Sequence, residues 1–564
     1  MGVLMLILMG TLLEILGVGL VIPVVTLLSQ PDVTSTSPTL KSLREALGAP
    51  SQRALMLWAL GGMLVVFVVK NAFIFLSTWF QVRFLYNYQA KLAGELMAGY
   101  LNRPYAFHLR HPTSELLQKV NGEVGALISG VLSPILWIIS ESLVVTGLVL
   151  LALWVSPLGA LAAMGGLGLA LWAYYHLFKA RVEAWGRSTQ EHSQGMYRQM
   201  QHGLGGIKEV KIFGRELFFS NAFSHHAQGL AHYTIRHNFL AQSSRNVIEL
   251  LVIAVLLGAI MLLVGASEGT ATIIPMLAFF AAAAFRLMPS AQRLLANANS
   301  IRYGARSLRL LRADLLGAPD PMPSSPSPAN PVSFRDQLEL RHVSFRYPGG
   351  HEDVLADLNL AIPRGAMVGF QGKSGAGKTT LVDLILGLLE PTQGEVWVDG
   401  NSIHQNLPGW QAKVGYVPQS IFLVDDTLRR NVAFGMEDDQ IDDARVHEVL
   451  RQAQLEDFVN SRPEKLEIAF GERGVRLSGG QRQRIGIARA LYHDPAILVL
   501  DEATASLDLD TEAQFIKAVG SLKNTKTILI ISHRFSTLED CDVKYQLEEG
   551  VLRPLEIKTA NVKR

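Results

Sequence analysis

Six long apolar stretches crowd the first 310 residues of this 564-residue chain and restrict what that half can fold into. They run over residues 2–28, 55–80, 131–155, 157–178, 247–267 and 272–292. A helix needs about 20 apolar residues to cross the hydrocarbon core of a bilayer, where every backbone polar group has to be bonded within the helix. The sequence therefore predicts an all-α membrane domain of six spans over residues 1–316. The first stretch has no basic residue and is too long for a signal peptide, so we expect it to be a span.

Basic residues give the orientation of these spans. The polar segments 81–130 and 179–246 together hold fourteen Lys and Arg, whereas the loops on the opposite side hold three, Lys41, Arg44 and Arg53. Cytoplasmic loops carry the excess of basic residues, so we expect both long segments in the cytoplasm. Their mixed polarity predicts that spans two to five continue as helices past the membrane.

A proline-rich segment ends the membrane half. Residues 317–331 read GAPDPMPSSPSPANP, which is extended and cannot build a core. We assign residues 317–337 to a linker, 338–556 to a soluble α/β domain and 557–564 to a tail. The net charge of +2 gives no case for nucleic acid as a partner, and the single cysteine, Cys541, cannot form an internal disulfide.

A glycine-rich loop follows the strand-like residues 366–370 and precedes an apolar helical run. This is the context of a phosphate-binding loop, in which backbone N–H groups wrap the phosphates at a helix N-terminus. Lys378 is expected to reach the outer phosphates, and the Thr379 hydroxyl to bind Mg²⁺. The residues assigned to phosphate binding are Gly372, Lys373, Ser374, Gly375, Ala376, Gly377, Lys378, Thr379 and Thr380.

Three further segments carry chemistry at strand ends or turns. An apolar strand at 497–500 ends in Asp501 and Glu502, which suit a Mg²⁺ ligand and a group that polarises the attacking water. Another strand at 528–531 ends in Ser532 and His533. Between these and the phosphate loop lies a second glycine turn that offers backbone donors to a γ-phosphate, Leu477-Ser478-Gly479-Gly480-Gln481.

This ordered series resembles the nucleotide-binding domain of ABC transporters over residues 338–550. The resemblance implies an α/β P-loop ATPase joined to an exporter-type membrane domain, with ATP and Mg²⁺ as cofactors. It implies that Tyr347 stacks on adenine and that Thr379, Gln419 and Asp501 bind Mg²⁺. Glu502 is implied as general base and His533 as the switch histidine.

The same resemblance implies a pair of chains. In the family, Ser478 and Gly480 would bind the γ-phosphate of ATP held by the partner subunit, so we expect a homodimer. Asp508 matches the D-loop aspartate, although Ala505-Ser506 exchanges the family's usual Ser-Ala. Residues 471–474 resemble the exporter-specific loop. Coupling contacts are expected around 112–120 and 206–214.

Several ionisable residues fall within or beside the spans. Each costs about 2.5–3.5 kcal/mol to insert, so each suggests an inward-facing position. They are Glu14, Lys70, Glu141, Arg245, Glu249, Arg286 and Arg293. Pairing among themselves or snorkelling to the headgroups is the alternative to lining a cavity for an anionic cargo.

The external loop and span six narrow the class of exporter. Residues 40–50 predict a short amphipathic helix near 39–48, similar to that of the flippase for lipid-linked oligosaccharides in bacterial protein N-glycosylation, and residues 285–290 also resemble that family. The resemblance implies that Lys70, Arg245 and Arg286 attract the lipid pyrophosphate, with Lys70 a departure that loses the guanidinium fork.

The main prediction is an ATP-driven flippase of a lipid-linked oligosaccharide or polysaccharide precursor in the cytoplasmic membrane, with the ATPase domain in the cytoplasm. Its partners are a second copy, membrane lipids and the glycan-bearing lipid. An exporter of drugs, peptides or lipid A is the alternative. A non-transporting regulator would show a degraded base at position 502 or a broken signature, which is the glycine turn at 477–481, and neither is present.

Overall fold

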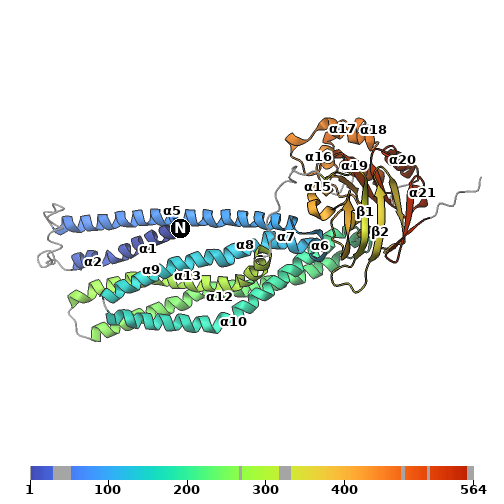
Figure 1. Ribbon diagram of the computed structural model, residues 1–564. Coiled ribbons are helices and arrows are strands. Elements are labelled where there is room, and N and C mark those ends of the chain that lie inside the picture. Colours follow the sequence, from blue (N-terminus) through green and yellow to red (C-terminus); the bar gives the residue numbers. More distant parts are fainter. Residues whose placement is uncertain are drawn as a thin grey trace, which may run out of the picture. The chain divides into compact units, whose positions relative to one another are not determined.

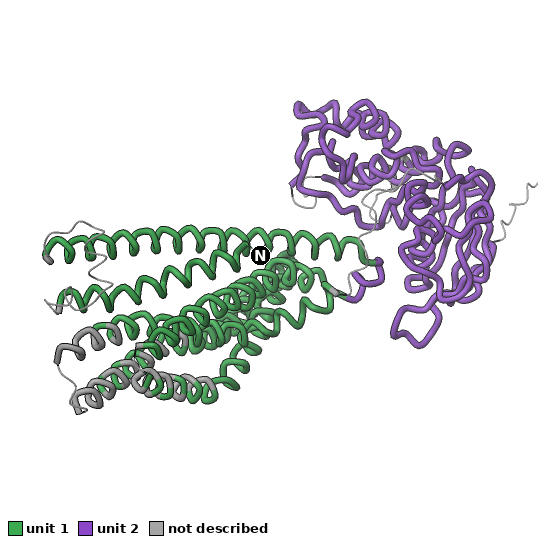
Figure 2. Tube along the Cα trace, turned by 60° about the vertical axis from the view of Figure 1, so that its left-hand side comes forward, with its two compact units in different colours: residues 1–103, 111–321 green, residues 104–110, 322–564 purple. Residues whose placement is uncertain are grey.

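The chain forms two compact units, which are described separately. One unit comprises Met1–Arg103 and His111–Pro321, and the other comprises Pro104–Arg110 and Met322–Arg564 (Figure 2). The computed structural model describes residues 2–29, 52–155, 157–265, 270–316, 332–471, 477–504 and 509–555. The expected external helix near 39–48, residues 472–474, Asp508, most of the linker and the tail lie outside the described residues.

The membrane unit is built from helices (Figure 1). The long ones are α1 (Gly2–Gly19), α2 (Val21–Ser29), α5 (Gln52–Leu101), α9 (Ser133–Val155), α10 (Pro157–Gly205), α12 (Glu216–Gly265) and α13 (Thr270–Leu316). The short ones are α7 (Thr113–Gln118), the π-helix η1 (Lys119–Glu123), α8 (Val124–Leu127), the π-helix η2 (Ile128–Leu132) and α11 (Ile207–Ile212). The short helix α6 (Tyr105–Arg110) belongs to the other unit.

Four of these helices are far longer than a bilayer requires. Helices α5 and α12 have 50 residues each, α10 has 49 and α13 has 47. At about 1.5 Å per residue they extend about 70–75 Å, more than twice the hydrocarbon core. The prediction that spans two to five continue past the membrane is confirmed, since the third span belongs to a continuous helical stretch of 42 residues, Thr113–Trp154. It holds for the sixth span as well.

The first span differs from its prediction. It is divided at Leu20 into α1 and α2, although both helices together remain long and apolar enough to cross a membrane. The physical reason is Pro23, which has no N–H to donate to the carbonyl of Gly19 one turn earlier. Within the described residues searched, two further stretches, Arg53–Leu101 and Thr113–Trp154, meet the same criterion of length and apolarity.

Small residues and apolar side chains hold the membrane helices together. Val18 of α1, Val144 and Leu148 of α9 and Ala283 of α13 form one buried cluster. Gly304 of α13 lies so close to η2 that a Cβ on it would lie 3.1 Å from the Gly130 carbonyl. Small residues allow such close backbone approach where apolar burial against lipid offers little driving force.

One cytoplasmic segment groups with the ATPase unit. Helix α6 belongs to that unit, and Ala106 packs against its apolar core. The expected coupling segment 112–120 lies in the membrane unit instead, so the segment that accompanies the ATPase unit is a few residues earlier than predicted. The second expected segment, 206–214, contains α11 and also belongs to the membrane unit.

The ATPase unit contains two sheets. An antiparallel sheet has the order β2-β1-β4-β5, and a six-stranded sheet has the order β10-β9-β3-β8-β7-β6, parallel except for β10. The strands are β1 (Gln337–Phe345), β2 (Leu355–Pro363), β3 (Met367–Gln371), β4 (Gln393–Val398), β5 (Asn401–Ser402), β6 (Val414–Val417), β7 (Ile497–Asp501), β8 (Thr527–Ile531), β9 (Val543–Glu548) and β10 (Val551–Pro554). The three strands expected from the sequence are β3, β7 and β8, and β1 begins at the last residue of the predicted linker.

Helices cover the central parallel strands. They are α14 (Lys378–Ile385), α15 (Leu407–Gln411), α16 (Leu428–Val432), α17 (Asp443–Gln452), α18 (Glu456–Asn460), α19 (Gly479–Tyr492), α20 (Leu509–Gly520) and α21 (Phe535–Leu538). The residues of β7 and β8 are buried throughout, as expected for strands covered on both faces. Trp410 is fully buried, and its indole N–H donates to the Ile385 carbonyl at 2.8 Å, which ties α15 to the end of α14.

Two glycines at the ends of β4 provide a test of this packing. Gly394 (φ 74°) lies opposite a bulge in β1, and a Cβ there would lie 2.2–2.3 Å from the carbonyl oxygens of His342 and Arg341. Gly400 has a similar φ of 81°, but its Cβ would meet nothing within 4 Å. We expect Gly394→Ala to lower the melting temperature of the ATPase unit clearly more than Gly400→Ala, which carries only the backbone cost of about 1 kcal/mol. Equal losses in thermal unfolding would contradict this packing.

Candidate active site

The carboxyl ends of four adjacent strands meet at one edge of the six-stranded sheet. The order of these strands is β3, β8, β7 and β6. The phosphate loop follows β3, His533 follows β8, Glu502 follows β7 and Gln419 follows β6. Ligands of open α/β sheets bind outside this edge, so the topology alone brings residues 372 to 533 of the chain to one place.

The loop after β3 has the backbone that phosphate wrapping requires. Gly375 and Gly377 have positive φ of 82° and 98°, and a Cβ on Gly377 would lie 2.8 Å from Leu355 Cδ2. Glycine is therefore needed at position 377 for both conformation and space. The Lys378 side chain folds back over the loop, and its Nζ donates to the carbonyls of Gly372 (2.9 Å) and Lys373 (3.0 Å).

Glu502 is the centre of the side-chain contacts at this edge. Its Oε1 lies 2.6 Å from His533 Nε2 and 3.5 Å from Lys378 Nζ, and its Oε2 accepts from Gln419 Nε2 at 2.9 Å. Lys378 Nζ also lies 3.1 Å from His533 Nε2. Four residues that the sequence assigned to separate roles are thus in direct contact.

The backbone at Glu502 is strained. Its φ is +47°, a left-handed conformation that costs about 1–3 kcal/mol for a residue with a side chain. The Glu502 N–H donates to the Ile531 carbonyl at 2.9 Å, which fixes the residue against the end of β8. This conformation turns the carboxylate out of the strand direction and towards the phosphate loop.

Asp501 provides a buried carboxylate that suits a divalent cation. Only 4% of the residue is exposed, and burial, followed by the charge of Glu502, raises the pKa of its carboxyl. Its hydrogen-bond partner is the Tyr416 hydroxyl at 3.4 Å. A cation would relieve the cost of ionising Asp501, and the oxygen donors of Thr379, Gln419 and Asp501 are the type that Mg²⁺ prefers. The residues therefore fit Mg²⁺.

The signature segment is ordered by its own helix cap. The Ser478 hydroxyl accepts from the Gln481 N–H at 3.2 Å, and the Gln481 side chain accepts from the Ser478 N–H at 3.0 Å, a capping box that begins α19. Over the described parts of the ATPase unit, no hydrogen bond or ion pair joins 477–481 to 372–380. The structure thus brings the phosphate loop, Gln419, Glu502 and His533 together and leaves the signature outside this cluster.

Tyr347 lies beside the phosphate loop. Its hydroxyl is 3.0 Å from Thr380 Oγ1, and its ring packs edge-on against Phe345. This position is compatible with the predicted contact to the base of the nucleotide.

The sequence reasoning missed three residues near the site. Burial, followed by the charge of Asp501, raises the pKa of Asp383 in α14 to about 6. Burial and Asp501 raise the pKa of Tyr416. Gln483, 4% exposed, donates to the Gln419 carbonyl at 3.1 Å and so links α19 to the segment after β6. Asp383 had a sequence signal, since it is the one charged residue in the apolar run LVDLI.

Comparison with known proteins agrees with this geometry. Residues 355–505 match the ABC transporter ATPase family, and residues 4–290, half of the chain, match the ABC transporter transmembrane region. The chain belongs to the ABC transporters. As in that family, an ATPase domain in the cytoplasm drives export through a membrane domain.

Relatives of this ABC transporter extend over nearly the whole chain. An ATP-dependent lipid A-core flippase of Alkalilimnicola ehrlichii is 31% identical, covering 80% of this chain and 76% of that protein. One of Bordetella avium is 28% identical, covering 93% and 89%. A bacterial Atm1-family ABC exporter with ATP bound has the same fold, with a TM-score of 0.77 at 23% identity over 98% of this chain and 93% of the other.

Four of the seven ionisable residues expected within or beside the spans, Glu14, Glu141, Arg286 and Arg293, are paired with one another. Arg286 of α13 donates Nε to Glu14 Oε1 of α1 at 2.8 Å and forms a second bond to Glu14 Oε2. Its NH1 donates to Ser290 Oγ at 2.6 Å. Glu141 of α9, 2% exposed, accepts from Ser290 Oγ and from Arg293 NH1, both at 2.6 Å.

The three residues expected to contact the cargo, Lys70, Arg245 and Arg286, therefore differ in their surroundings. Arg286 has its guanidinium fork occupied by Glu14, so the alternative of internal pairing holds for it. Lys70 forms no ion pair with the described residues, and its Nζ lies 4.5 Å above the Phe67 ring. The side chain of Arg245 lies outside the described structure.

Replacing Glu502 by Gln tests the assignment of the general base. The amide keeps the shape but cannot accept the proton of water, so we expect ATP hydrolysis to fall about 10²–10⁴-fold with ATP binding retained. Turnover and nucleotide binding of the purified transporter measure this. Glu464→Gln, an exposed carboxylate of the same unit, is the control and should hydrolyse ATP normally. Hydrolysis at the wild-type rate in Glu502→Gln would rule out Glu502 as the base.

Removing the Arg286 charge tests whether the pairing is structural. Arg286→Gln leaves Glu14 without its cation, and we expect a loss of about 3 kcal/mol in stability. Glu14→Gln/Arg286→Gln should recover at least half of this loss, because the buried charges are removed together. Arg306→Gln, which breaks a 3.6 Å surface pair with Glu191, should cost less than about 1 kcal/mol. Thermal unfolding in nanodiscs compares the stability of these variants. If the loss in the double variant equalled the sum of the losses in the two single variants, the pair would not be coupled.

Proposed function

We propose that this transporter is an ATP-driven flippase of an anionic amphipathic lipid, of the class represented by lipid A with its core sugars, and that it works as a homodimer. The observation that supports the cargo most directly is the 28–31% identity to lipid A-core flippases over 80–93% of the chain. Because both halves are included in these matches, they bear on the membrane unit that would handle the lipid and not only on the ATPase.

The relatives favour lipid A, the alternative among the sequence-based predictions, over a lipid-linked oligosaccharide. The predicted similarity to the flippase of protein N-glycosylation rested on an external helix and three cations. The helix lies outside the described residues, and the Arg286 guanidinium is bonded to Glu14 and Ser290. That leaves Lys70 as the described member of the three without a carboxylate partner.

Two features support a pair of chains. Ser478 and Gly480 are not joined to the phosphate loop of their own unit in the described residues, as expected if they complete the site of a second copy. Helix α11 and the residues after it also expose a cluster of large apolar side chains. They are Ile207, Ile212, Phe213, Leu217 and Phe218, with exposed fractions of 47–76%. Such a cluster at the cytoplasmic end of the membrane unit suits a protein interface.

The proposed reaction uses the contacts of Glu502. With ATP bound, Lys378 would turn from the loop carbonyls to the outer phosphates, and Glu502 would orient the attacking water and take its proton. His533 and Gln419 hold the two Glu502 oxygens in place. Mg²⁺, bound by Thr379, Gln419 and Asp501, would neutralise the phosphate charge when present. Helix α6 joins the ATPase unit to α5 and α7 through the chain itself, so movement of that unit is passed to the membrane helices.

Reconstitution in liposomes tests the cargo. We expect a fluorescent lipid A analogue to move between leaflets only with ATP, and movement to stop in Glu502→Gln. A fluorescent lipid-linked oligosaccharide and a cationic drug serve as comparison cargoes in the same vesicles. Transport of either comparison cargo, with lipid A left unmoved, would overturn the proposal and support the corresponding exporter class instead.

A further inference from the structure

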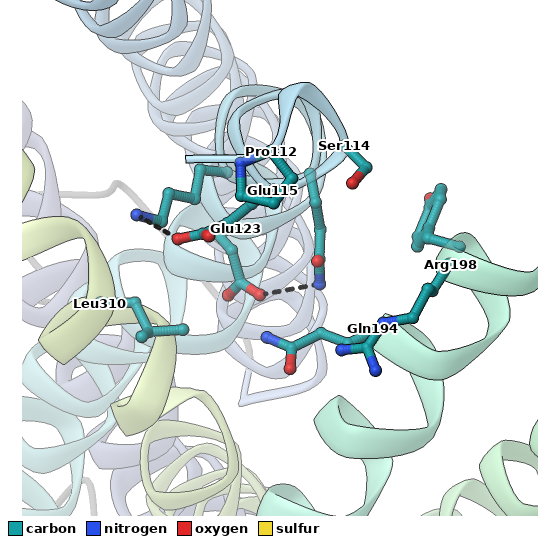
Figure 3. A pocket seen from close by; sticks show the side chains of 10 residues that line it. Pro112, Ser114, Glu115, Glu123, Gln194, Arg198 and Leu310 are labelled. Carbon is teal, nitrogen blue, oxygen red and sulfur yellow. Dashed lines mark hydrogen bonds and ion pairs between the residues drawn. The ribbon is translucent and has the colours of Figure 1, made fainter. Parts of the chain in front are cut away.

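A polar cavity of about 320 Å³ lies within the membrane unit, apart from the ATP site (Figure 3). Helices α7, η1, α10 and α13 supply its walls. The lining residues are Pro112, Ser114, Glu115, Gln118, Lys119, Glu123, Gln194, Tyr197, Arg198 and Leu310. This volume falls in the lower range of small-molecule sites, and eight of the ten lining residues are polar or charged, which suits a ligand that forms hydrogen bonds.

The cavity lies well outside the membrane. Helix α10 begins at Pro157 on the external side, and Arg198 is 41 residues further along it. At about 1.5 Å per residue this is about 60 Å, whereas the hydrocarbon core is about 30 Å thick. The cavity therefore lies about 30 Å into the cytoplasm, beyond the reach of a phospholipid headgroup, and its ligand has to be soluble in water.

One charged group of the cavity wall already has its partners. Lys119 Nζ lies 3.0 Å from both Glu115 Oε1 and Asp314 Oδ2. Asp314 also accepts from the Tyr100 hydroxyl at 2.9 Å. Lys119 is therefore paired with two carboxylates, and Lys119 and Glu115 lie in one wall of the cavity.

The two remaining charges of the cavity wall, the buried Glu123 and the exposed Arg198, form no ion pair within the part of the chain that the structure describes. Glu123 is 5% exposed, and its Oε1 accepts only from neutral amides, Gln190 at 2.5 Å and Gln118 at 3.4 Å. Arg198 forms no ion pair with any described residue. A buried carboxylate with neutral donors alone is costly, and a cation beside it would offset that cost.

These two charges face each other across the cavity. Figure 3 shows the side chains of Gln194 and Arg198 extending from α10 towards Glu123 on η1. The cavity thus offers an anion at one wall and a guanidinium at the other, with uncharged donors and acceptors between them. A simple anion would be repelled by Glu123, and a simple cation by Arg198, so a ligand with both charges fits best.

The backbone that carries Glu123 is itself unusual. Lys119–Glu123 forms a π-helical turn, and such turns are rare and occur frequently at functional sites. The turn alters the angular spacing of side chains along the helix, so Lys119 and Glu123 differ in direction from those of a regular α-helix.

We propose that this cavity binds a small water-soluble zwitterion of the amino-acid or short-peptide class. Its ammonium group is held by Glu123 and its carboxylate by Arg198, which presents a planar fork suited to a carboxylate. The amides of Gln118 and Gln194 and the hydroxyls of Ser114 and Tyr197 match the donors and acceptors of a peptide bond. A bound ligand connects η1, α10 and α13, three segments that otherwise meet around a cavity.

Dipeptides that differ only at their ends test each contact in the full-length transporter. Isothermal titration uses alanylalanine, its N-acetyl form and its C-terminal amide, with protein in nanodiscs of phosphatidylcholine. We expect the zwitterion to bind wild type at least 10-fold more tightly than either capped form. Glu123→Gln should weaken binding of the zwitterion and abolish the difference in affinity between the free and the N-acetylated dipeptide. Arg198→Gln should abolish the difference between the free dipeptide and its C-terminal amide.

A matched control separates these effects from general loss of structure. Glu191→Gln removes a carboxylate of α10, the helix that carries Arg198. The Glu191 side chain is 66% exposed, pairs with Arg306 and does not line the cavity. It should bind the zwitterion as wild type does, and basal ATP hydrolysis should be unchanged in it. Melting curves of all variants show whether they are folded.

Three results would overturn the inference. The first is that the zwitterion does not bind at millimolar concentration, and the second is that capped and uncapped peptides bind equally. The third is that both cavity variants bind the zwitterion as tightly as wild type does. Each of these results indicates a cavity filled by water. Competition by phosphatidylethanolamine nanodiscs would assign the site to a lipid headgroup and contradict a soluble ligand. The proposal is independent of the lipid cargo, so failure of the flippase assay leaves it standing.

Discussion

The parallel pairing of β6, β7, β8 and β3 is the constraint on which the ATP site depends. These strands are drawn from residues 367 to 531 of the chain, yet their carboxyl ends lie side by side. Once the pairing is formed, Gln419, Glu502 and His533 have little freedom, because each follows its strand by no more than two residues. The fully buried faces of β7 and β8 stabilise the arrangement on which the carboxylate geometry relies.

The residues assigned to the ATP site could be identified in the sequence because each stands at a strand end or a glycine turn. The order strand, loop, helix fixes Lys378 through local backbone rules, and the apolar strands before Glu502 and His533 are clear in the sequence. What the sequence does not contain is the contact of Glu502 with Lys378, His533 and Gln419, since side-chain distances follow from strand order. The positive φ of Glu502 and the burial of Asp383 likewise arise from tertiary packing.

The membrane unit was predicted in outline and less well in detail. Apolar length and basic residues indicate the spans and their orientation, but they do not say which face of a helix a charge lies on. Arg286, Glu14 and Glu141 lie on three different helices, and only packing brings them together. The division of the first span at Leu20 had a local signal in Pro23, whereas the position of α6 with the ATPase unit depends on contacts that no short motif describes.

Buried carboxylates of this chain occur in two settings, with and without a cationic partner in the protein. We use this difference to distinguish structural groups from groups that bind a ligand. Around Arg286 two guanidinium groups meet two carboxylates, so the cluster is neutral and needs nothing further. Asp501 and Glu123 are buried as deeply, but the hydrogen bonds to them come from neutral donors. Desolvation of an uncompensated carboxylate costs stability, which a structural role would not repay. A bound cationic group would offset this cost in both cases, and we propose Mg²⁺ for Asp501 and an ammonium group for Glu123. An uncompensated carboxylate is therefore the property that these two proposed sites share.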